Sequence, residues 1–213
     1  MPAIEPLYAD DVLLVLDKPG GLLAVPGRGA DKQDCLAARV QARYPDALIV
    51  HRLDMATSGL MVMARGPAAQ RALSKAFAAR EVRKRYIAVV AGRLEAPPEG
   101  WGLIDLPLIV DWPNRPLRRV DLLHGKPSLT RWRVLGHGDV ARTTRVELEP
   151  VTGRSHQLRV HLRELGHPIL GDALYAPPAI QARAGRLLLH ACSLGFIHPV
   201  TGEVQGFECP APF

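Results

Sequence analysis

The sequence contains little cysteine and no long apolar run. Its three cysteines, Cys35, Cys192 and Cys209, are too isolated for a disulfide framework or a Cys/His zinc finger. The longest apolar stretch, around residues 187–197, is interrupted by His190 and is shorter than the roughly 18 residues that a membrane span needs. We therefore expect a protein of a reducing cytoplasm, without an export signal or a membrane anchor.

Several reaction classes lose support because their motifs are missing. The sequence has no G-x-x-x-x-G-K-[ST] phosphate loop, no G-x-G-x-x-G dinucleotide motif and no G-x-S-x-G serine elbow. His156 and His161 do not have the H-E-x-x-H spacing of a helical zinc pair. A metal site is therefore poorly supported and a nucleotide or dinucleotide cofactor has no binding signal, and carboxylate, arginine and aromatic side chains remain for the chemistry.

Length, composition and apolar spacing indicate one α+β domain. The chain has 213 residues, 47% of them hydrophobic, and its 27 Lys and Arg exceed its 21 Asp and Glu, which moderately favours a polyanionic partner. Strands are predicted at 12–16, 86–90 and 143–148, helices at 34–44, 69–77 and 155–165, and a loop at 92–102. These helices do not alternate with the strands regularly, which argues against a doubly wound fold.

Residues that cap helices are expected at three positions. Asp34 and Ser155 stand at the start of two of the predicted helices and are candidate N-caps, while Gly166 is a candidate C′ residue.

The stretch HRLDMATSGL at residues 51–60 places Asp54 after His51 and Arg52 and before a Thr-Ser-Gly turn. An aspartate in this position either accepts backbone N–H groups of the turn or acts as a catalyst. His51, taken alone, is more often a structural hydrogen-bonding residue than a base. Both interpretations of Asp54 stay open from the residues alone.

The predicted helix at 155–165 has an apolar face with Leu158, Leu162 and Leu165, and a basic stripe beside it. The stripe contains His156, Arg159 and Arg163 and is typical of a solvated surface. Arg154 and Arg159 near the helix N-terminus also favour an anion there. That anion could be Asp54 or a phosphate.

Five stretches resemble the motifs of the RluA family of pseudouridine synthases, in the order in which that family has them. They are KPGGL at 18–22, HRLDMATSGL at 51–60, RKRYIAVV at 83–90, VTGRSHQLRVHLRELGHPILGDALY at 151–175 and LLLHACSLGFIHPVTGE at 187–203. VPGR at 25–28 and DLPLIVDWPNRP at 105–116 are similar to the members that act on both ribosomal and transfer RNA. One departure is Asp17, where relatives often have asparagine.

The resemblance implies a mixed, mostly antiparallel sheet flanked by helices and loops, with a central RNA cleft. It implies one catalytic domain over residues 1–213 without a separate S4 RNA-binding domain, since only about fifty residues precede Asp54. The implied activity is isomerisation of uridine to pseudouridine without a cofactor, in the anticodon loop of tRNA and in 23S rRNA. A monomer is the default expectation.

The resemblance also assigns residues. Asp54, Tyr86 and Arg159 are the implied catalytic residues, with Arg159 pairing Asp54 and Arg154 as the second candidate for that partner. Basic residues lead into the strand at 86–90 and follow Trp112 in a Pro-rich loop, where they could bind phosphates. The candidate RNA-binding residues are His51, Arg52, Arg83, Lys84, Arg85, Arg115 and Arg154.

Two other classes of function are weighed against this one. A non-catalytic RNA-binding or RNA-chaperone protein could have the same fold, and it would bind RNA without forming product. A glycosidase or nucleoside hydrolase acting on small molecules normally uses a second acid, and the motifs indicate none beside Asp54.

Overall fold

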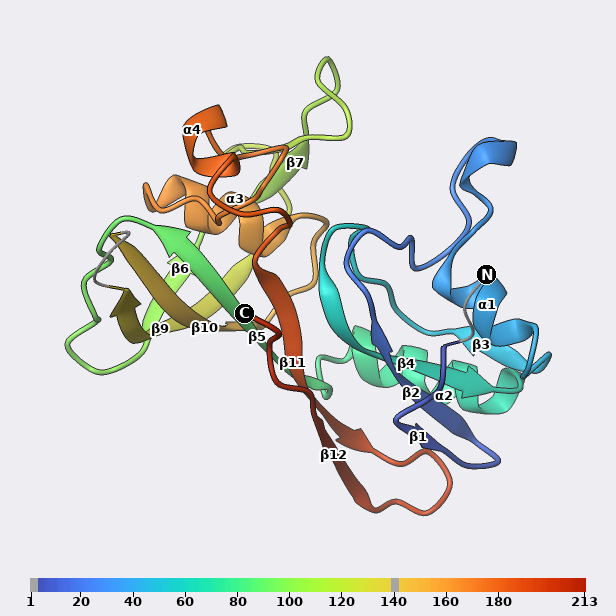
Figure 1. Ribbon diagram of the computed structural model, residues 1–213. Coiled ribbons are helices and arrows are strands. Elements are labelled where there is room, and N and C mark those ends of the chain that lie inside the picture. The colour runs from blue at the N-terminus through green and yellow to red at the C-terminus, as the bar shows by residue number, and fades with distance from the viewer. Residues whose placement is uncertain (1–3, 139–141) are drawn as a thin grey trace. The chain divides into compact units, whose positions relative to one another are not determined.

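The computed structural model describes residues 4–138 and 142–213, which form two compact units (Figure 1). The first unit contains the chain up to Lys84 together with His190–Pro212, and the second contains Arg85–Leu189 together with Phe213. Strand β5 (Arg83–Ala91) carries the chain from the first unit into the second, and β11 (Leu189–Ile197) carries it back. Among the residues so described, no helix is long and apolar enough to cross a membrane.

The strands of the first unit surround β4, which pairs on both of its edges. Strand β2 pairs with β4 antiparallel, β3 also pairs with it antiparallel, and β11 pairs with it parallel. The outer pairings β1 with β2 and β12 with β11 are antiparallel. The bounds are β1 (Tyr8–Ala9), β2 (Leu13–Lys18), β3 (Ala47–Ile49), β4 (Ser58–Arg65) and β12 (Val204–Glu208).

The apolar core of the first unit follows from β2 and β4, whose sequences LLVL and LMVMA are buried on both faces. One face packs against α2 (Pro67–Ala78) through Ala69 and Leu73. Two further short elements are η1 (Ala30–Lys32) and α1 (Leu36–Gln41). The β4–β11 pairing needs Gly59, because a Cβ there would lie 2.3 Å from the backbone oxygen of Ala191.

The second unit has its own antiparallel strands in the order β5, β10, β9 and β6. A separate pair, β7 and β8, packs with α3 through the buried residues Leu108, Val160 and Tyr175. The bounds are β6 (Gly102–Asp105), β7 (Leu108–Val110), β8 (Arg118–Val120), β9 (Leu129–Gly138), β10 (Thr143–Pro150), α3 (Gln157–Glu164) and α4 (Pro178–Gln181).

The α+β class and the mixed, mostly antiparallel pairing are confirmed, as are the strands at 86–90 and 143–148 and the helix at 69–77. Gly166 follows Leu165, the C-cap of α3, and has φ +81, as expected of a C′ glycine. The predicted strand at 12–16 begins at Leu13 and extends to Lys18.

Both predicted N-caps are wrong. Helix α1 begins at Leu36 with Cys35 as its N-cap, whose sulfur accepts from the N–H of Ala38. Asp34 instead accepts two hydrogen bonds from the Arg39 guanidinium. Helix α3 begins at Gln157, after His156 in the left-handed conformation, and Ser155 is exposed.

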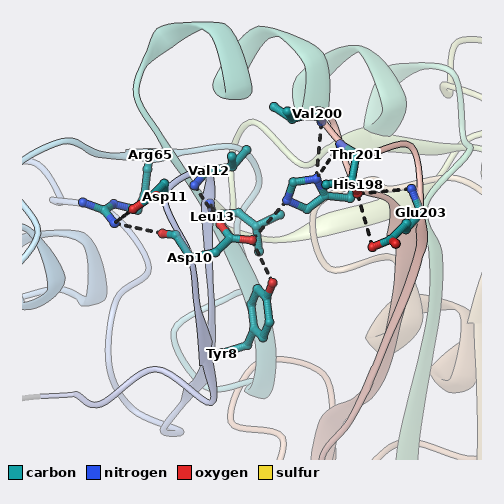
Figure 2. Close-up of polar contacts among 10 residues, drawn as sticks. All are labelled: Tyr8, Asp10, Asp11, Val12, Leu13, Arg65, His198, Val200, Thr201 and Glu203. Atoms are coloured by element: carbon teal, nitrogen blue, oxygen red, sulfur yellow. Dashed lines mark hydrogen bonds and ion pairs between the residues drawn. The ribbon is translucent and has the colours of Figure 1, made fainter.

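The turn between β1 and β2 is held by Asp10 (Figure 2). Its carboxylate accepts hydrogen bonds from the N–H groups of Val12 and Leu13, both at 2.7 Å, and from the Tyr8 hydroxyl at 2.8 Å. A fourth contact, 3.1 Å long, comes from Nε2 of the buried His198, whose Nδ1 accepts from the N–H of Thr201. Asp10 therefore links the start of the chain to the turn between β11 and β12.

Asp10→Ala should lower the free energy of unfolding by about 1–3 kcal/mol at pH 7, because four donors lose their acceptor. Burial opposes ionisation of Asp10, but the hydrogen bonds from Val12, Leu13, Tyr8 and His198 outweigh it and lower its pKa. A lowered carboxyl pKa stabilises the fold above the unfolded value of about 4, and this contribution disappears as the pH falls through the folded value.

The measurement is urea unfolding of both proteins at pH 7 and at pH 3, where the difference between them should become smaller. Asp11→Ala is the control, since that carboxylate is exposed and makes one ion pair, 3.7 Å long, with Arg65. An equal loss in both variants at pH 7 would rule out this role of Asp10.

Candidate functional site

Asp54 lies in the loop between β3 and β4, and its side chain is half-buried. The backbone oxygen of Asp54 accepts from the N–H of Thr57 at 3.1 Å, and that of Met55 accepts from the N–H of Gly21 at 2.8 Å. The Asp54 loop is thus a turn closed by main-chain hydrogen bonds, and one of them ties it to Gly21 of the KPGGL segment. The resemblance gave these two motifs separately, and the fold brings them together.

Lys18 of KPGGL is completely buried and was not selected from the sequence. Its ammonium donates to the carbonyl oxygens of Pro19 and Leu22 at 2.8 Å and of Met55 at 3.2 Å. A buried charge needs such partners. Because Met55 directly follows Asp54, the Lys18 ammonium fixes the backbone on which Asp54 stands.

Lys18→Met should lower the free energy of unfolding by an amount on the order of 3 kcal/mol, since it leaves the carbonyl oxygens of Pro19, Leu22 and Met55 without this charged donor. The Asp54 loop should also become mobile. Amide hydrogen exchange checks this: faster exchange should appear at Thr57 and Gly21, whose N–H groups close the turn. Unchanged protection at both amides would contradict the assigned role.

His51 and Lys84 both contact the ring of Phe77. The His51 ring stacks on Phe77 with centroids 4.4 Å apart, and the Lys84 ammonium lies 5.7 Å from the Phe77 centroid. Burial and the Lys84 charge lower the pKa of His51 to about 3. His51 is therefore neutral at pH 7, and its Nε2 accepts from the N–H of Val62 at 3.1 Å. This favours positioning of the loop over phosphate binding.

Arg159 is buried, so the predicted solvated stripe on this helix is wrong for that residue. Its guanidinium makes two hydrogen bonds to Asp172, 2.8 and 2.6 Å long, and the two side chains are 4% and 1% exposed. The sequence predicts an anion beside Arg159, but its spacing does not identify Asp172 as that anion. Asp172 also accepts from the N–H groups of Leu174 and Tyr175, so Arg159 is held by a carboxylate that is itself fixed.

Tyr175 connects the start of α3 to the β7–β8 pair. Its hydroxyl lies 2.6 Å from Nδ1 of His156 and accepts from the N–H of Arg118 at 2.9 Å. The Arg159 guanidinium lies 5.0 Å from the centre of its ring. Burial raises the pKa of Tyr175, so the hydroxyl keeps its proton at neutral pH.

Gln157 organises the turn before α3. Its side-chain oxygen accepts from the Thr152 hydroxyl and the N–H of Arg154, and its amide nitrogen donates to the Leu129 carbonyl and the Thr130 hydroxyl. This buried amide fixes the turn, whereas His156, the N-cap of α3, makes no side-chain cap hydrogen bond.

The other candidate RNA-binding residues present charge to solvent. Arg52, Arg83 and Arg115 are exposed, and Arg115 lies over the ring of the exposed Trp112, 3.3 Å from its centre. Arg154 is exposed, with its Nε donating to the carbonyl of Pro127. Arg85 differs, because it pairs with the buried Glu147 and contacts Trp101.

The candidate catalytic residues belong to different units. Asp54 lies in the first unit, whereas Tyr86 on β5 and Arg159 on α3 lie in the second. Tyr86 is half-buried and pairs in register with Leu148 of β10. Their meeting in one active site remains a prediction.

Comparison with known proteins gives consistent matches. A family model described as RNA pseudouridylate synthase matches residues 12–164. The dual-specificity RNA pseudouridine synthase RluA of Escherichia coli K12 is 50% identical over 212 residues, covering 100% of this chain and 95% of that protein. The protein of the same name from Yersinia pestis is 51% identical over 207 residues, covering 97% of this chain and 98% of that protein.

Solved structures match over nearly the whole chain. Human RNA pseudouridylate synthase domain containing 1 has a TM-score of 0.80 and 30% identity, covering 99% of this chain and 84% of that one. Human RNA pseudouridylate synthase domain containing 4 has a TM-score of 0.75 and 27% identity, covering 97% of this chain and 88% of that one.

Proposed function

Because the chain belongs to the RNA pseudouridylate synthase family, we propose that it isomerises uridine to pseudouridine in two classes of RNA. The observation that carries the proposal is the 50% identity, over the whole chain, to RluA proteins whose name states dual specificity. The two substrates are the anticodon stem-loop of tRNA and a loop of 23S rRNA.

The reaction needs no co-reactant. The C1′–N1 bond of uridine breaks, the uracil turns within the site, and C5 forms a bond to C1′. N1 gains a proton and C5 loses one, so the atoms balance without a redox step. The protein must therefore activate the sugar, hold the detached base and move one proton.

Asp54 activates the sugar. A carboxylate is ionised at neutral pH and can either attack C1′ as a nucleophile or remove a proton from the ribose. Both routes need the carboxylate to be held in place. The fixing of Met55 by Lys18 and Gly21 supports this role.

Tyr86 and Arg159 complete the proposed active site. Tyr86 stacks on the uracil, and such stacking contributes about 1–3 kcal/mol per base, comparable to the few kcal/mol that extrusion of a loop uridine costs. Arg159 pairs with Asp54. The double hydrogen bond from Arg159 to Asp172 supports a fixed guanidinium, which a precise partner of Asp54 requires.

RNA phosphates bind to the exposed cations. Arg52, Arg83, Arg115 and Arg154 are the proposed contacts, together with Lys84 and Arg85, which follow Arg83 in β5. The family match over residues 12–164 runs through both units, which supports one catalytic domain over residues 1–213. A monomer in the cytoplasm, where both RNA classes are found, completes the proposal.

The test is tritium release from RNA labelled at uridine C5, with an anticodon stem-loop transcript and a 23S rRNA loop fragment as separate substrates. Release from both is expected, since C5 loses its hydrogen in the reaction. Release from one RNA alone would reject dual specificity. RNA binding without release from either would overturn the proposal and favour a non-catalytic RNA-binding protein.

A further inference from the structure

A second polar cluster of the first unit has no part in the proposed reaction. It consists of Asp17 in β2, His190 in β11 and Cys209 just after β12, and donor atoms of the three side chains lie within 4.8 Å of one another. The three positions are far apart in sequence. Their approach is a product of the strand order.

The strand register explains this approach. Asp17 pairs with Leu60 of β4, and His190 pairs with Ser58. Side chains alternate across a strand, so Asp17 and His190 project from the face of β4 that carries Leu60. Cys209 packs against the apolar core that contains Leu60. The cluster therefore lies on the same face of the sheet as the apolar core residue Leu60.

The donor set matches a borderline-soft dication. Carboxylate oxygen, imidazole nitrogen and thiolate sulfur are the three donor types that bind Zn²⁺ in proteins. Ionised Asp17 and Cys209 would give two negative charges, which one divalent ion neutralises. Bond lengths in tetrahedral zinc sites place donors about 3.5 Å apart, so donor atoms that lie within 4.8 Å of one another would move closer together on binding.

His190 has the support that ligating histidines have. Its side chain is 2% exposed, and Nδ1 lies 2.8 Å from the Ser58 hydroxyl. A metal-bound histidine usually directs its second ring nitrogen to such a partner. The Cys209 carbonyl can only accept, so Nε2 carries the ring proton in its 3.1 Å contact with that oxygen. Metal binding through Nε2 would break this contact and shift the proton to Nδ1, which would then donate to the Ser58 hydroxyl.

The thiol carries a proton until a metal displaces it. Burial and the adjacent Asp17 carboxylate raise the pKa of Cys209 to about 11. Binding therefore forms a sulfur–metal bond and releases one proton to the buffer, as for other cysteine ligands.

We propose that Asp17, His190 and Cys209 bind one Zn²⁺ ion, with water in the fourth position. The ion would connect β2, β11 and the end of β12. It would also fix the His190 ring against Ser58, the first residue of β4 after the Asp54 loop. This site is independent of the reaction proposed for Asp54.

The test titrates the reduced, metal-stripped full chain with Co²⁺ as a spectroscopic probe and then displaces it with Zn²⁺. A thiolate-to-cobalt charge-transfer band at one equivalent is expected, and it should persist in Cys192→Ser. This control removes the thiol of Cys192, which lies in β11 but does not belong to the cluster. Cys209→Ser should lose the band, and Asp17→Asn should weaken Co²⁺ binding at least about tenfold.

Two results would overturn the site: no charge-transfer band in the unmodified chain, or a band that Cys209→Ser retains. Asp17 is exposed, so Asp17→Asn should fold even if Cys209→Ser does not, and it then provides the test. Unchanged Co²⁺ affinity in Asp17→Asn would then reject the three-residue site.

Discussion

Asp54→Asn is expected to abolish tritium release from both RNAs and to leave RNA affinity within a few-fold. Asparagine has nearly the same shape as aspartate, but its neutral amide can neither attack C1′ nor remove a ribose proton. The loop itself should persist, because the described turn uses the backbone of Asp54 and Met55. Single-turnover assays and filter binding measure the two quantities separately.

Asp31→Asn is the matched control for this experiment. Asp31 is an exposed aspartate in η1, so its variant should turn over both RNAs at the wild-type rate. Near-wild-type release by Asp54→Asn would remove Asp54 from the chemistry. A loss of RNA affinity as large as the loss of release would instead indicate a binding role.

Asp172→Ala should lower the free energy of unfolding by about 3–5 kcal/mol, because it leaves the buried Arg159 guanidinium without its carboxylate. Product formation should fall too, since Arg159 loses the group that orients it. Urea unfolding and single-turnover release are the measurements. Asp34→Ala is the control: Asp34 also makes two hydrogen bonds to an arginine, Arg39, but these side chains are 38% and 15% exposed.

The control pair should contribute only about 0–1 kcal/mol, the usual range for exposed ion pairs. Equal costs in Asp34→Ala and Asp172→Ala would contradict the importance of burial. The double variant Arg159→Met/Asp172→Leu separates stability from catalysis. It should regain most of the lost stability, as apolar replacements of buried pairs do, and it should stay inactive. Activity in that variant would exclude Arg159 from the mechanism.

Much of the fold could be predicted because its pattern is local. The β5 segment YIAVV is apolar on both alternating faces, and α2 repeats its apolar residues at helical spacing. The Asp54 loop was also found from sequence, since HRLDMATSGL is continuous in the chain. These features require no knowledge of distant neighbours.

The missed features depend on distant partners. Lys18 is 37 residues from Met55, and Gln157 is 27 residues from Thr130, so neither burial nor hydrogen bonding could be read from local spacing. Arg159 lies on the polar stripe by periodicity, yet Asp172, 13 residues later, provides the charge that allows burial. The Asp17, His190 and Cys209 cluster likewise depends on the strand order.

The first unit is interrupted in sequence, and this has a consequence for the order of folding. Its parallel pairing joins β4 to β11, where Ser58 and His190 are 132 residues apart, whereas the second unit is continuous apart from Phe213. Contacts between distant residues form slowly because the intervening chain must close into a loop. On the ribosome, β2 and β4 emerge long before β11, so the unit that is synthesised first can be completed only after the other one has been made.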